Sequence, residues 1–121
     1  MARIVVIDDD PISCKLAATP LQQDGHTVDS FTEPQAGLRA TLEHPPALLV
    51  TDLIMPGPDG IEIIKAVKRS HPEVKIVAMS GGGSAGKDLY LRMARKLGAD
   101  AIIRKPLDQG EYAEAVSKCL A

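Results

Sequence analysis

The amino-acid sequence predicts one α/β domain, spanning residues 1–121, with a doubly wound, five-stranded parallel sheet and helices on both of its faces. Near-continuous apolar runs are typical of strands that are buried on both sides of a parallel sheet, and helical patterns separate each run from the next. The length and the ordinary balance of 45% apolar and 25% charged residues fit a single globular core.

The expected strands are short and follow one another regularly. Four apolar runs predict buried strands, whereas a fifth segment alternates and predicts an edge strand. Right-handed crossovers between these strands use the whole chain in five βα units. The buried strands are expected at residues 3–8, 47–52, 74–80 and 101–103, and the edge strand at residues 27–31.

The helices are predicted from the signals at their ends. Asp10 before Pro11 is typical of a helix start, and Gly25 and Gly98 stand where helices are expected to end. Pro20 falls inside the first helical pattern, so we expect it to kink that helix or to end it early. Capping-box spacing predicts three further helix starts, at Thr32 with Gln35, Asp59 with Glu62, and Asp108 with Glu111.

The last three helices each carry an apolar stripe. Side chains three or four residues apart share one side of a helix, so each stripe is expected to face the core. The stripes are Ile61, Ile64 and Val67; Leu89, Met93 and Leu97; and Tyr112, Val116 and Leu120.

The composition argues against several classes of protein. A net charge of −2, only three aromatic residues and no Trp disfavour a nucleic-acid binder. No apolar run approaches the ~20 residues of a membrane span, and the N-terminal residues do not form a secretory signal. Cys14 and Cys119 lack metal-site spacing and are expected to be reduced thiols. We therefore expect a cytoplasmic protein that binds neither nucleic acid nor membrane.

Polar side chains that follow the predicted strands point to a functional site. Asp8 and Asp9, Asp52, Ser80 and Lys105 each stand at or just beyond the end of an apolar run. In doubly wound sheets the ligand site lies outside the carboxyl ends of the strands, so these side chains are expected to converge.

The chemistry of this set favours phosphate and a hard cation. Neighbouring carboxylates repel one another unless a cation neutralises them, and an oxygen-only cluster suits Mg²⁺. A lysine beside Mg²⁺ forms a site for a phosphoryl group, to which Ser80 can donate a hydrogen bond. An aspartate in such a site can act as a nucleophile and form an aspartyl phosphate.

The segment from Asp52 to Gly60, DLIMPGPDG, resembles the D-x-x-M-P-x-x-D-G signature of response-regulator receiver domains. Asp8 with Asp9, Ser80, and Lys105 with Pro106 match further landmarks of that family in the same order. The resemblance covers essentially the whole chain. It implies a flavodoxin-like fold with strand order 2-1-3-4-5.

The resemblance also implies a role for each site residue. Asp52 would be the phosphoacceptor, and Asp9, Asp52 and the backbone carbonyl of Ile54 would bind Mg²⁺. Asp8 would assist through hydrogen bonds or bound water. Lys105 would pair with the acids and then with the phosphoryl group, toward which Ser80 would swing. The bond between Lys105 and Pro106 would be cis, and Gly60 would permit the turn into the third helix.

The function implied is that of a signalling phosphoacceptor, which catalyses only its own phosphorylation and slow dephosphorylation. A histidine kinase or histidine phosphotransfer protein would donate the phosphoryl group from a phosphohistidine. Because one receiver domain uses the whole chain, no output domain is expected. A downstream protein would then dock on the face formed by the fourth helix, fifth strand and fifth helix. There Arg92, Arg95 and Lys96 predict a basic cluster suited to an acidic partner.

The sequence departs from the family at the switch residues. Ile102 stands where an aromatic residue is usual, so it is expected to be core filler. The signal would then pass through the loop after Ser80, beginning at Gly81. Ile54 and Gly82 occupy positions that tune hydrolysis, where Ile54 would partly shield the acyl phosphate and Gly82 would leave it open.

Other functions stay open at this point. Residues 81–87, GGGSAGK, approach a P-loop, but Asp88 replaces the Ser or Thr that would bind Mg²⁺. A small phosphatase would use Asp8 as its nucleophile. Further alternatives are a receiver without phosphorylation chemistry that acts as an interaction module, and a receiver domain cut from a hybrid kinase or a longer regulator.

Overall fold

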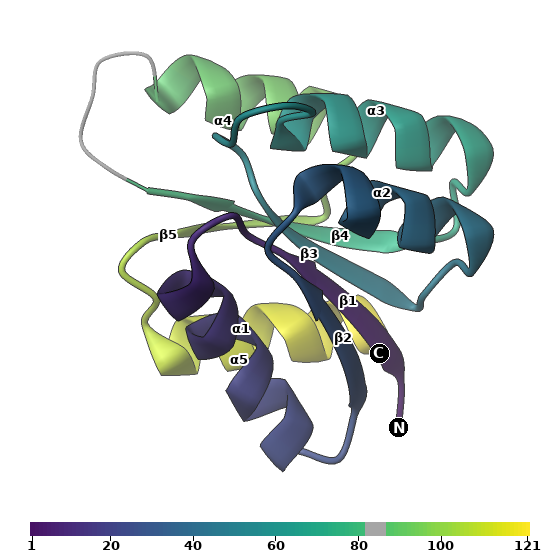
Figure 1. Ribbon diagram of the computed structural model, residues 1–121. Coiled ribbons are helices and arrows are strands. Elements are labelled where there is room, and N and C mark those ends of the chain that lie inside the picture. Colours follow the sequence, from purple (N-terminus) through teal and green to yellow (C-terminus); the bar gives the residue numbers. More distant parts are fainter. Residues whose placement is uncertain (82–86) are drawn as a thin grey trace.

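The computed structural model describes residues 1–81 and 87–121, which form a parallel sheet and five helices (Figure 1). The strands are β1 (Arg3–Ile7), β2 (Thr27–Phe31), β3 (Leu48–Asp52), β4 (Lys75–Ser80) and β5 (Ala101–Arg104). The helices are α1 (Pro11–Gln23), α2 (Pro34–Glu43), α3 (Gly60–Ser70), α4 (Lys87–Lys96) and α5 (Gln109–Leu120). The predicted strands are all present within one or two residues of their expected bounds.

The strand order is β2-β1-β3-β4-β5, and every pair of neighbouring strands is parallel. The predicted fold class and strand order are therefore confirmed, and β2 is an edge strand as expected. The expectation that residues 101–103 form a fully buried strand is wrong, because β5 is the other edge of the sheet and only Ile103 in it is buried. The chain leaves β1 toward β2 and later returns to place β3 on the other side of β1. Crossovers therefore leave β1 and β3 in opposite directions, which opens a crevice at the carboxyl ends of these two strands.

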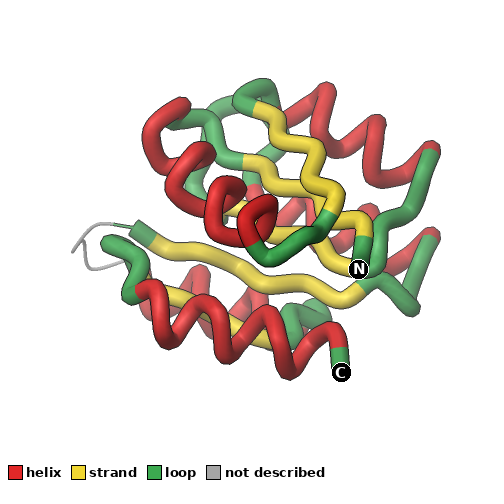
Figure 2. Tube along the Cα trace, turned by 90° about the horizontal axis from the view of Figure 1, so that it is seen from below, coloured by secondary structure: helices red, strands yellow, loops and turns green. Residues whose placement is uncertain are grey.

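Two helical layers enclose the sheet, with α1 and α5 on one face and α2, α3 and α4 on the other (Figures 1 and 2). Alternate side chains of each strand enter opposite cores, as the pleat requires. In β1, Ile4 and Val6 join the core beneath α1 and α5, whereas Val5 and Ile7 join the core beneath the other three helices. This burial on both faces explains the near-continuous apolar runs. None of the described helices has the length and apolar character needed to cross a membrane.

Three of the predicted helix caps are confirmed. Asp10 accepts a hydrogen bond from the Ile12 amide, Asp108 accepts one from the Glu111 amide, and Asp59 with Glu62 forms a complete capping box. The prediction at Thr32 is wrong. Helix α2 is preceded by Glu33, whose extended backbone is the conformation that a following proline favours, and begins at Pro34.

The expected early end of α1 at Pro20 is wrong, because the helix continues to Gln23. Proline removes the hydrogen bond to the carbonyl group four residues earlier, which here belongs to Leu16 on the exposed side of the helix. Water can donate a hydrogen bond to that carbonyl group, so the helix tolerates the loss of its internal hydrogen bond. Gly25 and Gly98 follow α1 and α4 with φ values of 93° and 114°, which confirms the predicted helix ends.

The apolar stripe predicted for α4 is wrong at two of its three positions. Leu89 and Met93 are 56% and 39% exposed, and the buried face of the helix carries Leu91 and Ala94 instead. Leu97 packs against the core, as predicted. The expected stripes of α3 and α5 do face the core. Helix α4 thus presents apolar side chains on both its inner and its outer side.

Tyr112 joins the two helices beneath the sheet. Its side chain is buried, and its hydroxyl group donates a hydrogen bond of 2.8 Å from α5 to the carbonyl group of Ala17 in α1. Burial raises the pKa of this phenol, so the hydroxyl keeps its proton and remains a donor. Both cysteines are buried free thiols, as predicted.

We predict that Tyr112→Phe lowers stability by about 1 kcal/mol, because it removes one buried hydrogen bond without leaving a cavity. Thermal unfolding should show a fall in Tm of about 4 °C. Tyr90→Phe, which changes the other tyrosine, is the matched control. Equal Tm values for the wild-type protein and Tyr112→Phe would show that the hydrogen bond does not stabilise the fold.

Candidate functional site

Three carboxylates meet at the carboxyl edge of the sheet, as predicted. Asp8 and Asp9 directly follow β1, and Asp52 ends the neighbouring strand β3, where Ile7 and Thr51 lie side by side. One carboxylate oxygen from each of the three residues lies within 4.8 Å of the other two. Asp8 is fully buried, Asp52 is 7% exposed and Asp9 is partly open to solvent. The crevice between β1 and β3 therefore holds a concentrated negative charge.

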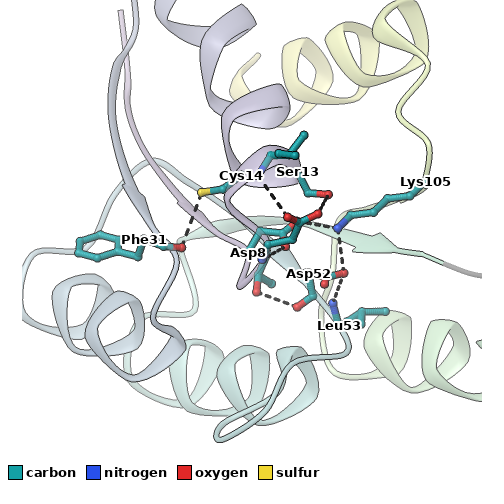
Figure 3. Close-up of polar contacts among 10 residues, drawn as sticks. Asp8, Ser13, Cys14, Phe31, Asp52, Leu53 and Lys105 are labelled. Atoms are coloured by element: carbon teal, nitrogen blue, oxygen red, sulfur yellow. Dashed lines mark hydrogen bonds and ion pairs between the residues drawn. The ribbon is translucent and has the colours of Figure 1, made fainter.

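Lys105 enters this acid cluster from the other end of the chain (Figure 3). Its Nζ atom lies 2.5 Å from Asp8 Oδ2 and 3.5 Å from Asp52 Oδ1. The Lys105 amide also donates a 2.7 Å hydrogen bond to the carbonyl group of Ser80, which fixes the backbone beyond β5 against the end of β4. The bond between Lys105 and Pro106 is cis, as predicted.

The carboxylate of Asp8 is held on both of its oxygens. Oδ2 accepts a hydrogen bond from Lys105, and Oδ1 accepts a 3.0 Å hydrogen bond from the Asp10 amide. The side chain of Asp10 instead caps α1 by accepting hydrogen bonds from the Ile12 amide and the Ser13 hydroxyl. Asp8 is thus a fixed anchor for the lysine, which fits an indirect role.

The charge of Asp52 is only partly compensated by its neighbours. Burial, together with the nearby charges of Asp8 and Asp9, raises the pKa of Asp52 to about 6, although Lys105 and a hydrogen bond from the Leu53 amide oppose that rise. Among the described residues, the ammonium group of Lys105 thus lies in a cluster of three carboxylates. A divalent cation would relieve the repulsion, and an oxygen-only donor set suits Mg²⁺. The residues present therefore fit a magnesium site.

Ser80 ends β4 beside this cluster and is fully buried. Its Oγ atom has no hydrogen-bond partner in the part of the chain that the structure describes. Burying a hydroxyl group without a partner costs free energy, so such groups in native proteins usually serve a purpose. A phosphoryl oxygen near Asp52 would give this hydroxyl group an acceptor.

The remaining predicted residues differ in their surroundings. Ile54 is 50% exposed, and Ile102 is a half-buried strand residue that packs against the core beneath α4, as expected of core filler. Gly81 is partly buried, and a Cβ atom there would lie 3.4 Å from Lys105 Cδ. Pro106 is exposed. Gly82 and most of the P-loop-like segment lie outside the described residues, so those interpretations stay predictions.

The role predicted for Gly60 needs correction. Its φ angle is not positive, so conformational freedom is not the reason for a glycine here; the positive φ in this loop belongs to Gly57, at 77°. A Cβ atom on Gly60 would lie 2.3 Å from the Asp52 carbonyl oxygen and 2.6 Å from Leu53 Cα. Gly60 thus lets the start of α3 approach the backbone that carries Asp52.

Sequence reasoning missed the backbone groups that orient the site. The amides of Asp10 and Leu53 hold the carboxylates of Asp8 and Asp52, the latter at 3.1 Å. Every residue except proline has such an amide, so no side-chain pattern could have indicated these two. The close packing of Gly60 was missed as well, although a glycine directly after a helix cap was a signal for it.

Comparison with known proteins identifies close structural and sequence relatives. A family model described as response regulator receiver domain matches residues 4–117. The transcriptional regulatory protein FixJ of Azorhizobium caulinodans is 33% identical over 95% of this chain, and the nitrogen assimilation regulatory protein NtrX of the same organism is 31% identical over 87%. This chain spans 53% of the length of FixJ and 23% of that of NtrX.

Solved structures show the same similarity. A response regulator receiver domain protein from Clostridium thermocellum superposes with a TM-score of 0.89 at 27% identity, covering 99% of this chain and 94% of that one. The receiver domain of NtrX from Brucella abortus superposes with a TM-score of 0.87 at 27% identity, covering 97% of each chain. The similarity therefore covers the whole described fold, including the edge of the sheet where the acids meet.

We predict that Gly60→Ala destabilises the protein by about 2 kcal/mol, because backbone atoms must move to admit the methyl group. The shift should also displace Asp52, so added Mg²⁺ should raise the Tm less in this variant than in the wild-type protein. Gly110→Ala, in the exposed first turn of α5, is the matched control and should be neutral or stabilising. A Gly60→Ala variant with wild-type stability and an unchanged Mg²⁺ response would contradict this role.

We also predict a pH-dependent effect of Asp52→Asn in the presence of a chelator. Because the pKa of Asp52 is raised to about 6 in the folded state, its contribution to stability is present at pH 4 and is lost as the pH rises through 6. Asp52→Asn lacks this loss and should be more stable than the wild-type protein by about 2 kcal/mol at pH 7.5. Urea unfolding from pH 4 to 7.5 measures the difference, and a difference that does not change with pH would refute the prediction.

Proposed function

The chain belongs to the response-regulator receiver domain family, and we propose that it accepts a phosphoryl group on Asp52 from a phosphohistidine in a Mg²⁺-dependent reaction. The donor would be a histidine kinase or a histidine phosphotransfer protein. The observation that carries this proposal is the meeting of three carboxylates, Lys105 and the Ser80 hydroxyl at one edge of the sheet, where Ser80 has no hydrogen-bond partner among the described residues. The protein would act as a signalling switch and not as an enzyme on an external substrate.

In the proposed reaction an Asp52 carboxylate oxygen forms a bond to phosphorus, and the bond from phosphorus to the donor's imidazole nitrogen breaks. The imidazole leaves with its electron pair and regains a proton. A pKa of about 6 leaves Asp52 mainly ionised at neutral pH, as a nucleophile must be. Asp52 is also attached to rigid backbone at the end of β3, which favours a fixed line of attack.

The neighbours of Asp52 have complementary roles in this proposal. Asp9, Asp52 and the Ile54 carbonyl group would hold Mg²⁺, and Asp8 would assist indirectly. When bound, Mg²⁺ supplies positive charge for the phosphoryl oxygens. Lys105, anchored by Asp8 and 3.5 Å from Asp52, would contact one of those oxygens, and Ser80 would donate a hydrogen bond to another.

A phosphatase that uses Asp8 as its nucleophile is less well supported. Asp8 is fully buried, and its two oxygens accept hydrogen bonds from Lys105 and from the Asp10 amide. A carboxylate engaged in this way has little freedom to attack phosphorus. Asp52 retains 7% exposure, whereas Asp8 has none, and its raised pKa is that of a destabilised group, so Asp52 is the better nucleophile.

The phosphoryl group would switch a docking surface. The phosphoryl group carries about −1.5 to −2 charges, which replace the single negative charge of the Asp52 carboxylate. They would lie beside Ser80 and Lys105, whose backbones are joined by a hydrogen bond. Movement of these residues would reach α4, β5 and α5, and a downstream protein would bind that face. Ile102 is not aromatic, so the signal would pass through the backbone beyond Ser80. A receiver within a longer regulator or a hybrid kinase would use the same site.

We predict that a small phosphodonor such as acetyl phosphate labels the wild-type protein in the presence of Mg²⁺ and that labelling of Asp52→Asn falls to background. Asp8→Asn should label more slowly by about 10- to 100-fold, because it loses the anchor of Lys105 but keeps the acceptor. Mass spectrometry of the intact chain measures the added phosphoryl group.

Asp24→Asn, which changes an exposed aspartate at the end of α1, is the matched control and should label like the wild-type protein. Labelling of Asp52→Asn at the full wild-type rate would exclude Asp52 as the phosphoacceptor. Loss of labelling in Asp8→Asn with retention in Asp52→Asn would favour the phosphatase-like alternative.

A further inference from the structure

The buried threonine directly before Asp52 carries a polar group that packing does not require. Thr51 is fully buried in β3, and the three residues before it in the strand are apolar and equally buried. Valine has nearly the same shape and would avoid the burial of a hydroxyl group. The hydroxyl group of Thr51 does have a partner, because it donates a 2.9 Å hydrogen bond to the carbonyl oxygen of Asp52.

The side chains of Thr51 and Asp52 lie on opposite faces of the sheet. Successive side chains of a strand point to alternate sides, and Leu49 and Val50 accordingly belong to two different cores. Thr51 therefore faces the same side as Leu49, beneath α2, α3 and α4, whereas Asp52 faces the acid cluster. Any effect of the Thr51 hydroxyl group on the Asp52 carboxylate must then pass through the backbone.

The peptide group between Asp52 and Leu53 connects the two side chains (Figure 3). Its carbonyl oxygen accepts the hydrogen bond from Thr51, and its amide donates a 3.1 Å hydrogen bond to Oδ1 of the Asp52 carboxylate. The same amide also donates a 3.0 Å hydrogen bond to the carbonyl oxygen of Met79 in β4. The orientation of the peptide plane determines how the amide is divided between these two acceptors. Because the peptide group is planar, a contact that fixes its carbonyl end also fixes its amide end.

The place of this carbonyl group in the sheet explains why it needs a donor from a side chain. The register of β1 and β3 ends at Ile7 and Thr51, so the Asp52 carbonyl group lies beyond the last paired residues of these strands. Gly60 packs so closely on the carbonyl oxygen that a Cβ atom there would lie 2.3 Å from it. A buried carbonyl group without a donor costs free energy, and Thr51 supplies a donor where the pairing of β1 with β3 ends.

We propose that Thr51 is a positioning residue for the Asp52 carboxylate. Its hydroxyl group fixes, through the intervening peptide group, the amide that holds Oδ1, and it thereby sets the direction in which the carboxylate points. Hydrogen bonds in a chain also polarise one another, so the hydroxyl group strengthens the bond from the amide to the carboxylate. The inference rests on the proposed function, because a fixed direction speeds phosphoryl transfer only if Asp52 is the acceptor.

A buried threonine elsewhere in the chain provides a matched control for a merely structural role. Thr41 in α2 is also fully buried, and its hydroxyl group donates a 2.8 Å hydrogen bond to the carbonyl oxygen of Gly37. That carbonyl group is not joined to any carboxylate of the acid cluster. Loss of the hydroxyl group should therefore lower stability to a similar extent at either threonine, whereas only its loss at Thr51 should slow phosphorylation.

Labelling of the full chain by acetyl phosphate in saturating Mg²⁺ tests the inference, with intact mass spectrometry as the measurement. We expect Thr51→Val to lower the initial rate of labelling by about three- to tenfold, because the carboxylate is no longer held in one direction. Thr51→Ser keeps the hydroxyl group and should label at close to the wild-type rate. Thr41→Val should label like the wild-type protein.

Thermal unfolding of the same variants separates positioning from stability. Both valine variants should lower the Tm by a similar amount, about 4 °C, because each loses one buried hydrogen bond. Thr51→Ala also lacks the hydroxyl group and should be slowed at least as much as Thr51→Val. Equal labelling rates for Thr51→Val and Thr41→Val would overturn the inference, and so would a Thr51→Ser variant that is as slow as Thr51→Val.

The amide proton of Leu53 provides a readout that does not depend on phosphorylation. Its NMR chemical shift reports the hydrogen bonds that the amide donates. Thr51→Val should change this shift, whereas Thr51→Ser should leave it close to its wild-type value. A Leu53 shift that is the same in the wild-type protein and in Thr51→Val would contradict the proposed connection through the peptide group.

The two measurements distinguish this inference from the proposed function. If acetyl phosphate labels Asp52 in the wild-type protein but Thr51→Val and Thr41→Val label equally, the inference fails and the proposed function stands. If Asp52 of the wild-type protein is not labelled, the proposed function fails. A Leu53 amide that shifts in Thr51→Val and not in Thr51→Ser would then still support the orienting role of Thr51.

Discussion

The ion pair between Lys105 and Asp8 is the interaction on which the rest of the site depends. Asp8 is fully buried, and a buried carboxylate is tolerable only with a charged or hydrogen-bonding partner. The pair joins residues 97 positions apart in the chain, so it ties the first βα unit to the last. It also brings the ammonium group to 3.5 Å from Asp52. This one ion pair therefore fixes both the buried Asp8 carboxylate and the position of the Lys105 ammonium group beside Asp52.

The parallel sheet explains why much of the site could be predicted from the sequence. An apolar run that ends in a polar residue indicates both a buried strand and its carboxyl end, and in a parallel sheet all such ends share one edge. Asp8, Asp52 and Ser80 could be placed together in this way. Lys105 could be included in the predicted site because it follows the last apolar run of the chain. Local rules also predicted the caps at Asp10, Asp59 and Asp108, because a cap depends on only a few neighbouring residues.

The features that could not be predicted depend on contacts between distant segments. Two apolar stripes of α4 were equally consistent with helical periodicity, and only packing on α3 and the sheet decides that Leu91 and Ala94 face inward. The close approach of Gly60 to the Asp52 carbonyl group likewise requires β3 and α3 to be in place. At Thr32 a side-chain pattern competed with the backbone preference of Pro34, and the proline determined where α2 begins.

The environment, and not the residue type, distinguishes the three aspartates. Both oxygens of Asp8 are paired, so its charge is compensated and its position fixed. Asp9 is partly open to solvent, which lowers the cost of its charge and leaves it available to a cation. Asp52 is buried and its charge is only partly compensated, which is why its pKa is raised. A cation bound between these carboxylates would relieve that imbalance. The fold thus leaves the charge of Asp52 incompletely compensated. Because the ends of β4 and β5 are linked beside it by the hydrogen bond between Ser80 and Lys105, a ligand bound at Asp52 would change contacts in both strands.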